Sequence, residues 1–218
     1  MSDTMLWLLF FAVVLLGVLI AVFCRVRFTT KKITIIGLMA ALSFVAYEFF
    51  RIPNVFGTGS SFHLGNTFTA LTAILLDGVS GGLAGAIGLS LADIFAGDPG
   101  YAVTTFLLKL IIGLVCGLFA KKVFHLKQHS LGSKKDFRYL LRVGGSAFSG
   151  LLVNVFTDPF IGYFRNRYMF GQAVDMAVVM TKISSGVTLI NSLLSTVCAV
   201  ILYLALFPAL EKAGLLED

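Results

Sequence analysis

The chain has 218 residues, of which 58% are hydrophobic and 13% charged, and its mean hydropathy is +0.94. A water-soluble domain carries about 25% charged residues, so this composition excludes an ordinary soluble enzyme or binding domain. The net charge of +6 does not require a nucleic-acid partner, because membrane proteins collect lysine and arginine in their cytoplasmic loops. We therefore expect an all-α, multi-pass protein of the cell membrane, in contact with the lipid bilayer and not with nucleic acid.

Seven apolar segments follow one another along the chain, and each is a candidate membrane span. The sequence leaves open whether the third and fourth are two helices or one broken helix. An amphipathic stretch at 170–182 is too short to span, and we expect it to form a short surface helix. The apolar segments cover about residues 5–24, 33–50, 64–77, 79–97, 101–120, 138–164 and 183–209.

Glycines recur in the fourth and fifth segments. Gly81, Gly85 and Gly88 lie in the fourth, and Gly113 and Gly117 in the fifth. Small residues at this spacing give a helix a flat face, so we expect close helix–helix contacts here.

The first segment, 5–24, is interpreted as a retained transmembrane helix and not as a signal peptide. No basic region precedes it, no small-residue cleavage pattern follows it, and it is long enough to span. Basic residues then set the orientation, because two loops on the same side hold eleven of the 17 lysines and arginines. We expect that side to be cytoplasmic, with the N-terminus outside and the C-terminus inside. The eleven residues are Arg25, Arg27, Lys31, Lys32, Lys121, Lys122, Lys127, Lys134, Lys135, Arg138 and Arg142.

Asp93 and Lys109 are charged residues inside apolar segments, where a charge is costly unless it has a partner or a function. Asp93 lies near the outer end of its span, and Lys109 lies about 12 Å deep in the next at 1.5 Å per residue. Because a lysine side chain can reach back toward the interface, the two could meet. A packing ion pair between two helices is one interpretation. We favour the other, in which the pair forms the polar floor of an outward-facing cavity.

Polar residues on one face of each of three predicted helices form three stripes, which lie at about the same membrane depth as Asp93 and Lys109. Each alone is explained by hydrogen bonds between helices, but three at the outer ends of three spans, beside an aromatic loop at 51–66, favour a pocket for a small planar or polar ligand. Glu48 and Arg51, three residues apart, are expected to form an interfacial salt bridge. The stripes are Tyr101, Thr105 and Lys109; Asn154 and Asp158; and Ser184, Thr188, Asn191 and Ser195, while His63 and Asn66 close the first outer loop.

The chain contains no nucleotide-binding, zinc-protease or serine-hydrolase motif. We therefore expect no catalytic activity and no cofactor. If the protein drives uptake, the energy must come from a partner or from an ion gradient.

Four stretches carry a family resemblance, namely "KKITIIGLMAALSFVA", "GNTFTALTAILLDGVSGGLAGAIGLSLADIFAG", "TTFLLKLIIGLVCGLFAKK" and "VNVFTDPFIGYF". Over about residues 30–209 the sequence resembles the substrate-binding S component of energy-coupling factor (ECF) vitamin transporters. The resemblance implies a six-helix membrane domain over 30–210, an extra N-terminal helix and basic turn over 1–29, and a cytoplasmic tail over 211–218.

The resemblance also implies partners and a site. The partners are a membrane coupling protein and two ATPase subunits, docked through small residues at Gly37 and Ala41. The substrate site would contain Phe62, His63, Asn66, Asp93, Tyr101, Lys109, Asn154, Asp158 and Asn191. The last span lacks the buried lysine of riboflavin-binding members, which argues against riboflavin and for a smaller pyridoxine- or pyrimidine-like ring.

Two other functions stay open at this point. A self-sufficient ion-coupled transporter would use Asp93, Lys109 and Asp158 as a proton relay. A structural membrane subunit would use the polar stripes only to join helices. A capture subunit binds its ligand alone but needs partners for uptake, an ion-coupled transporter moves its substrate alone, and a structural subunit binds nothing.

Overall fold

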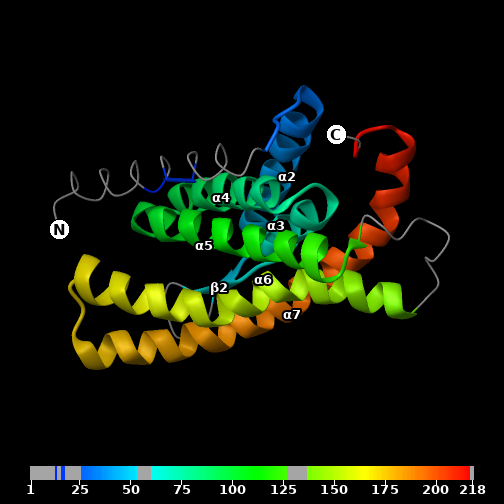
Figure 1. Cartoon of the computed structure of the whole chain (residues 1–218). Helices are drawn as coiled ribbons and strands as arrows, with labels where there is room; N and C mark the ends of the chain where they lie inside the picture. The colour runs from blue at the N-terminus through cyan, green and yellow to red at the C-terminus, as the bar shows by residue number, and fades with distance from the viewer. Residues whose placement is uncertain (1–12, 14–15, 18–25, 54–59, 127–136, 217–218) are drawn as a thin grey trace.

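Six α-helices make up most of the described chain and lie together as a bundle (Figure 1). The structure is a computed structural model that describes residues 13, 16–17, 26–53, 60–126 and 137–216. Two π-helical turns extend α5 and α6, and two short strands pair antiparallel between α2 and α3. The predicted all-α class is confirmed. The elements are α2 (Thr30–Glu48), β1 (Ile52–Pro53), β2 (Ser61–Phe62), α3 (Gly65–Leu75), α4 (Gly78–Phe95), α5 (Pro99–Leu118), η1 (Phe119–Val123), α6 (Phe137–Phe164), η4 (Arg165–Met169) and α7 (Val174–Lys212).

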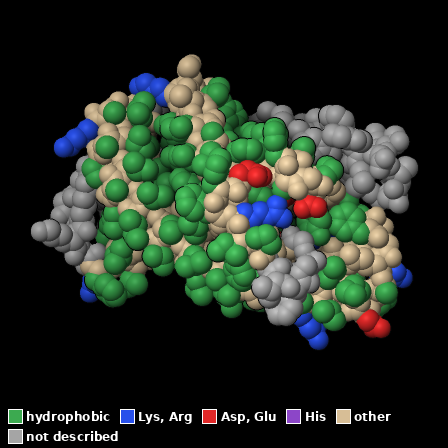
Figure 2. All heavy atoms as spheres, turned by 180° about the vertical axis from the view of Figure 1, so that it is seen from behind, with side chains coloured by type: hydrophobic (Ala, Val, Ile, Leu, Met, Phe, Trp, Pro, Cys, Tyr) green, Lys and Arg blue, Asp and Glu red, His purple; other side chains and the backbone are tan. Residues whose placement is uncertain are grey.

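The outer surface of the bundle is suited to lipid. Figure 2 shows one face that is largely hydrophobic, with acidic and basic side chains gathered near its centre. Five helical segments, all except α3, are long and apolar enough to cross a membrane. The predicted span over 5–24 lies mostly outside the described residues, but Val13 from it packs against a cluster that contains Phe106 and Leu110 of α5. The chain is a multi-pass membrane protein.

The apolar stretch 64–97 forms two helices, which resolves the alternative that the sequence left open. α3 has 11 residues and is about 16 Å long at 1.5 Å per residue, so it does not cross the bilayer by itself. It lies inside the bundle, where Ala70 and Leu71 are fully buried. α4 begins directly after Asp77, whose carboxylate accepts hydrogen bonds from the amide and the hydroxyl of Ser80, both at 2.9 Å. This N-cap fixes the break between the two helices.

Glycines let α4 approach its neighbours closely on two faces, as the sequence predicted. On one face, a Cβ added to Gly81 would clash with the backbone of Ala73 in α3, and one added to Gly88 would clash with the α2 backbone. On the other face, a Cβ added to Gly113 of α5 would clash with the backbone of Gly82. The helices therefore meet backbone to backbone, and their polar side chains are held at fixed separations.

The final helix differs from its prediction. Residues 170–182 do not form a separate surface helix, because α7 begins at Val174 and continues for 39 residues. Hydroxyl groups of Thr181 and Ser185 donate to carbonyls one turn earlier, at 2.7 and 3.0 Å, so these polar residues are accommodated without a break. At 1.5 Å per residue α7 is about 58 Å long, well beyond the roughly 30 Å hydrocarbon core. α6 and α7 run side by side (Figure 1).

Basic residues gather at one end of the bundle. At the start of α2, Lys32 pairs with Asp77 at the start of α4, with 3.0 Å between Nζ and Oδ2. Lys31 donates a hydrogen bond of 3.0 Å to the carbonyl of Gly214, just after α7. The two lysines of η1 line the same groove as Asp77. The predicted substrate residues lie toward the opposite end, where α4 and α6 end and α5 and α7 begin.

Candidate substrate-binding site

A small polar cavity lies among the helix ends opposite the basic end, with a volume of about 80 Å³. The three polar stripes predicted on α5, α6 and α7 all contribute to it. Eight of the nine predicted substrate residues line it, namely His63, Asn66, Asp93, Tyr101, Lys109, Asn154, Asp158 and Asn191. The other lining residues are Tyr47, Ser60, Ser61, Leu89, Thr105, Leu108, Arg165, Ser184, Val187 and Thr188.

Asp93 and Lys109 face the same cavity but do not form a direct ion pair. Asp93 is 5% exposed and Lys109 is 7% exposed. The Asp93 carboxylate accepts hydrogen bonds from the hydroxyls of Thr105, one turn before Lys109, and of Tyr47 on α2. Within the described parts of the chain, Lys109 has no hydrogen bond or ion pair. The expected buried pair is therefore corrected: hydroxyl groups satisfy Asp93, and the ammonium group of Lys109 is left at the cavity.

Asp158 connects α6 to α7 through hydroxyl groups. Its Oδ2 accepts hydrogen bonds from Ser184 at 3.0 Å and from Thr188 at 2.7 Å. Asn154, one turn earlier on α6, and Asn66 on α3 are each 2% exposed. Their amide oxygens have no hydrogen-bond partner among the residues described. A buried acceptor without a partner is costly, so a ligand that carries N–H or O–H groups would relieve this cost.

His63 is neutral at physiological pH. Burial, followed by the positive charges of Lys109 and Arg51, lowers its pKa to about 3. Its Nδ1 accepts a hydrogen bond from the Gly65 amide at 3.2 Å, so in the neutral ring Nε2 carries the proton. The ring packs against Tyr47, with centroids 4.8 Å apart. His63 therefore contributes an aromatic face and one N–H donor to the cavity wall, and no charge.

Asn191 holds β2 in place. Its Nδ2 donates to the Ser61 carbonyl at 2.9 Å, and its Oδ1 accepts from the His63 amide at 3.2 Å. The backbone of β2 and of the residue after it thus uses both ends of this amide, which makes Asn191 a positioning residue for the strand and for His63. Phe62 does not line the cavity, because successive side chains of a strand point to opposite faces. Its neighbours Ser61 and His63 line the cavity, and a substrate-binding role of Phe62 stays a prediction.

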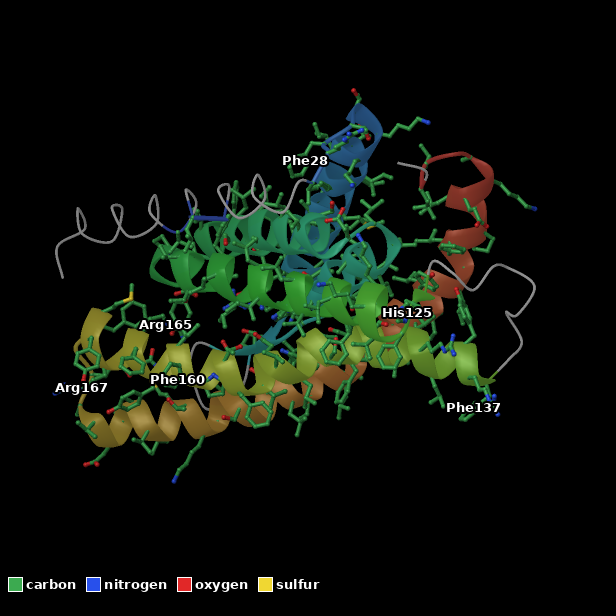
Figure 3. The ribbon with its side chains drawn as sticks, viewed as in Figure 1. Phe28, His125, Phe137, Phe160, Arg165 and Arg167 are labelled. Atoms are coloured by element: carbon green, nitrogen blue, oxygen red, sulfur yellow. The ribbon has the colours of Figure 1, made fainter. Side chains whose placement is uncertain are left out.

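The sequence interpretation missed Tyr47 and Arg165. Arg165 begins η4 and is 7% exposed. Its Nη1 donates to the Thr104 hydroxyl at 3.0 Å, and its guanidinium group lies 3.9 Å from the centroid of the Tyr101 ring. Figure 3 shows it between the ends of α5 and α6. An arginine at the end of a span looks like an interfacial anchor in the sequence, and the surrounding aromatics in "GYFRNRYMF" were the available signal.

Arg51 joins the segment after α2 to the α4–α5 turn. Its Nη2 lies 3.7 Å from Oδ2 of Asp98, and its Nε donates to the Ser61 hydroxyl at 2.9 Å. The predicted salt bridge between Glu48 and Arg51 is therefore wrong. The guanidinium group turns toward Asp98 and β2, and it stands 5.1 Å from the centroid of the Tyr47 ring.

Gly37 and Ala41 lie one turn apart on the same exposed face of α2. A Cβ added to Gly37 would meet nothing within 4 Å. This face is therefore open for a partner, and the docking role of the two residues stays a prediction.

Together, the bundle and its cavity define a membrane protein with a small polar cavity that is lined by buried charged and amide side chains. A family model described as the ECF-type riboflavin transporter S component matches residues 27–207, and the chain belongs to this family. No curated protein and no solved structure matched the chain. The resemblance seen in the sequence is confirmed: the protein is a substrate-binding subunit of a transporter, and its family is not a class of enzymes.

Proposed function

We propose that this subunit captures a water-soluble, single-ring vitamin or vitamin precursor of a pyridoxine- or pyrimidine-like kind at the outer face of the cell membrane. The cavity is the observation that supports this proposal. Its volume is about 80 Å³, whereas ligand pockets commonly measure about 300–1,000 Å³, so one ring is favoured over a three-ring flavin. The amide oxygens of Asn66 and Asn154, which have no partner among the described residues, favour a ligand with several N–H or O–H groups.

The ends of the bundle support an outward-facing site. The basic end that contains Lys31 and Lys32 is assigned to the cytoplasm, because lysine and arginine are retained there during insertion. The cavity then opens toward the outside. The N-terminus lies outside if the helix over 5–24 is retained, and the C-terminus lies in the cytoplasm.

Delivery of the ligand requires a partner in this proposal. The partner is an ECF module with a membrane coupling protein and two ATPase subunits, which supplies the energy that the chain has no motif to obtain. The exposed face of α2 at Gly37 and Ala41 is the proposed contact, because small residues allow another helix to approach closely.

An ion-coupled transporter is the second candidate. The specific observation in its favour is that Asp93, Asp158 and Lys109 all line one cavity in the membrane, which is how proton relays are built. In that case the protein alone would move substrate in response to a pH gradient.

Native mass spectrometry of the detergent-purified protein tests the proposal. A single co-purifying vitamin-like mass is expected, and Lys109→Met should lose it. Lys121→Met, at the exposed basic end, is the matched control and should retain it. Uptake into proteoliposomes should then require the ATPase module. Uptake by the subunit alone would favour the ion-coupled candidate, and an empty protein that binds no vitamin would contradict the capture function.

A further inference from the structure

The two cations and the two carboxylates of the cavity are satisfied in different ways. Asp93 and Asp158 accept hydrogen bonds from hydroxyl groups of neighbouring helices. Lys109 and Arg165 line the same cavity, and neither has a carboxylate partner within the described residues. A buried cation that no carboxylate contacts directly is costly, so the cations are the incomplete part of this site.

Arg165 is held firmly but not fully satisfied. Its contact with Thr104 uses Nη1, and the ring of Tyr101 covers one face of the guanidinium group. Its Nε is buried without a hydrogen-bond partner in the described chain. These contacts fix the plane of the guanidinium group and leave donors for a further acceptor, since arginine carries five N–H donors.

The side chains of Lys109 and Arg165 lie toward the same part of the cavity. Helix side chains lean toward the N-terminus of their helix, so Lys109 on α5 leans toward the turn that carries Thr105 and Tyr101, where Arg165 is stacked. Asp93, on the neighbouring helix, interacts electrostatically with both cations. The two positive groups are therefore placed to act on one ligand group.

We infer that Lys109 and Arg165 together bind an anionic group of the ligand, a carboxylate or a phosphate ester. The inference rests on the proposed capture function and adds the substrate class. Arginine offers a planar pair of donors that matches either anion, and lysine adds a compact charge. Since the carboxylates of Asp93 and Asp158 also line the cavity as hydrogen-bond acceptors, the rest of the ligand must offer hydrogen-bond donors, as a ring with hydroxyl or N–H groups does.

Two matched pairs of single-ring compounds test the inference with the purified full-length protein. Nicotinate and nicotinamide differ in a carboxylate, and pyridoxine 5′-phosphate and pyridoxine differ in a phosphate ester. Isothermal titration should show that the anionic member of at least one pair binds about tenfold or more tightly than its neutral partner, as expected for a charge-assisted contact. The pair that shows this preference distinguishes a carboxylate ligand from a phosphate ligand.

Variants assign the preference to the two cations. Arg165→Gln and Lys109→Gln should each remove it, whereas Arg165→Lys should keep part of it. Arg167→Gln is the matched control, because Arg167 belongs to the same π-turn but lies at the outer end of the α6–α7 hairpin (Figure 3) and donates to the Gln172 carbonyl. Melting temperatures measured without ligand show whether each variant is folded.

Three results would overturn the inference. These are equal or tighter binding of the neutral member in both pairs, a preference that survives in Arg165→Gln, and no binding by any of the four compounds. The mass of a co-purifying ligand separates this failure from that of the capture function. A neutral bound vitamin would refute the anion site and leave capture intact, whereas an empty protein with no ligand would refute both.

Discussion

Replacement of Gly113 by alanine should destabilise the protein, because the α4–α5 contact has no room for a methyl group. The Cβ of the new alanine would overlap backbone atoms of Gly82 and Gly78 on α4. Backbone atoms cannot rotate away as the end of a side chain can, so the two helices would have to separate. Gly186 on α7 is a matched control, since a Cβ added there meets nothing within 4 Å.

The free energy of unfolding should change in opposite directions in the two variants. Forcing one methyl group into a close-packed contact costs about 1–3 kcal/mol, and alanine recovers roughly 0.5–1 kcal/mol of helix propensity. Gly113→Ala should therefore lose about 1–2 kcal/mol, which lowers the melting temperature by about 2–8 °C in a chain of this length. Gly186→Ala keeps only the gain in propensity and should raise the melting temperature by about 1–4 °C.

The assay heats both variants in the same detergent and measures the fraction of protein that stays monodisperse at each temperature. The midpoint of this curve is the melting temperature. Equal melting temperatures for the two variants would refute the reasoning. That result would mean that the α4–α5 interface accommodates a methyl group and does not fix the distance between the helices.

Three further perturbations test other parts of the molecule. Asp77→Asn should lower the melting temperature by about 2–8 °C, because it leaves the buried Lys32 without its carboxylate. Burial alone would raise the pKa of Asp77, but hydrogen bonds from Ser80 and Lys32 outweigh it and hold that pKa below its usual value. Stability from this pair is therefore present above about pH 4 and lost on acidification below it, so the variant should lose less stability than the wild type between pH 6 and pH 3. Asn191→Ala removes its hydrogen bonds to Ser61 of β2 and to His63 and should raise the ligand dissociation rate about tenfold, as measured by stopped flow; an unchanged rate would contradict the positioning role. Gly37→Leu should leave ligand binding unchanged and abolish uptake with the reconstituted ATPase module, and unaffected uptake would exclude this face of α2 as the contact.

Local pattern was enough to predict most of the described helices and the close contacts at the glycines, but not the start of α7. The length of an apolar segment predicts a membrane span directly. The spacing of the glycines at 81, 85 and 88 predicts close helix packing, whichever helix lies against them. The i, i+4 spacing of Asn154 and Asp158 places both on one helix face, and the structure puts both at the cavity.

Properties that depend on a second helix could not be predicted from spacing. The sequence shows that Asp93 and Lys109 lie at compatible depths, but not that Thr105 and Tyr47 would satisfy the aspartate first. The role of Asn191 depends on a strand that forms in the first outer loop, more than a hundred residues earlier in the chain. Arg165 was missed for the same reason, because its partners lie on α5.

Packing and ligand binding are connected through the α4–α5 contact. Gly82 and Gly113 hold the two helices together on the basic side, and Ser90 continues the contact toward the outer end by donating to the Ala102 carbonyl at 2.9 Å. One turn further along α4, Asp93 accepts its hydrogen bond from Thr105. The glycines therefore set the distance at which the Thr105 hydroxyl reaches the Asp93 carboxylate, and Lys109 then has no ion pair within the described part of the chain.

A consequence is that Gly113→Ala should weaken ligand binding as well as stability, although Gly113 does not line the cavity. Helix separation would weaken the bond from Thr105 to Asp93, and the carboxylate would then attract Lys109 and compete with the ligand for it. Loss of one such hydrogen bond corresponds to about a threefold to tenfold rise in Kd. Titration of Gly113→Ala and Gly186→Ala below their melting temperatures, with the ligand identified by mass spectrometry, measures this effect. Equal affinity in the two variants would show that the cavity is independent of the glycine contact.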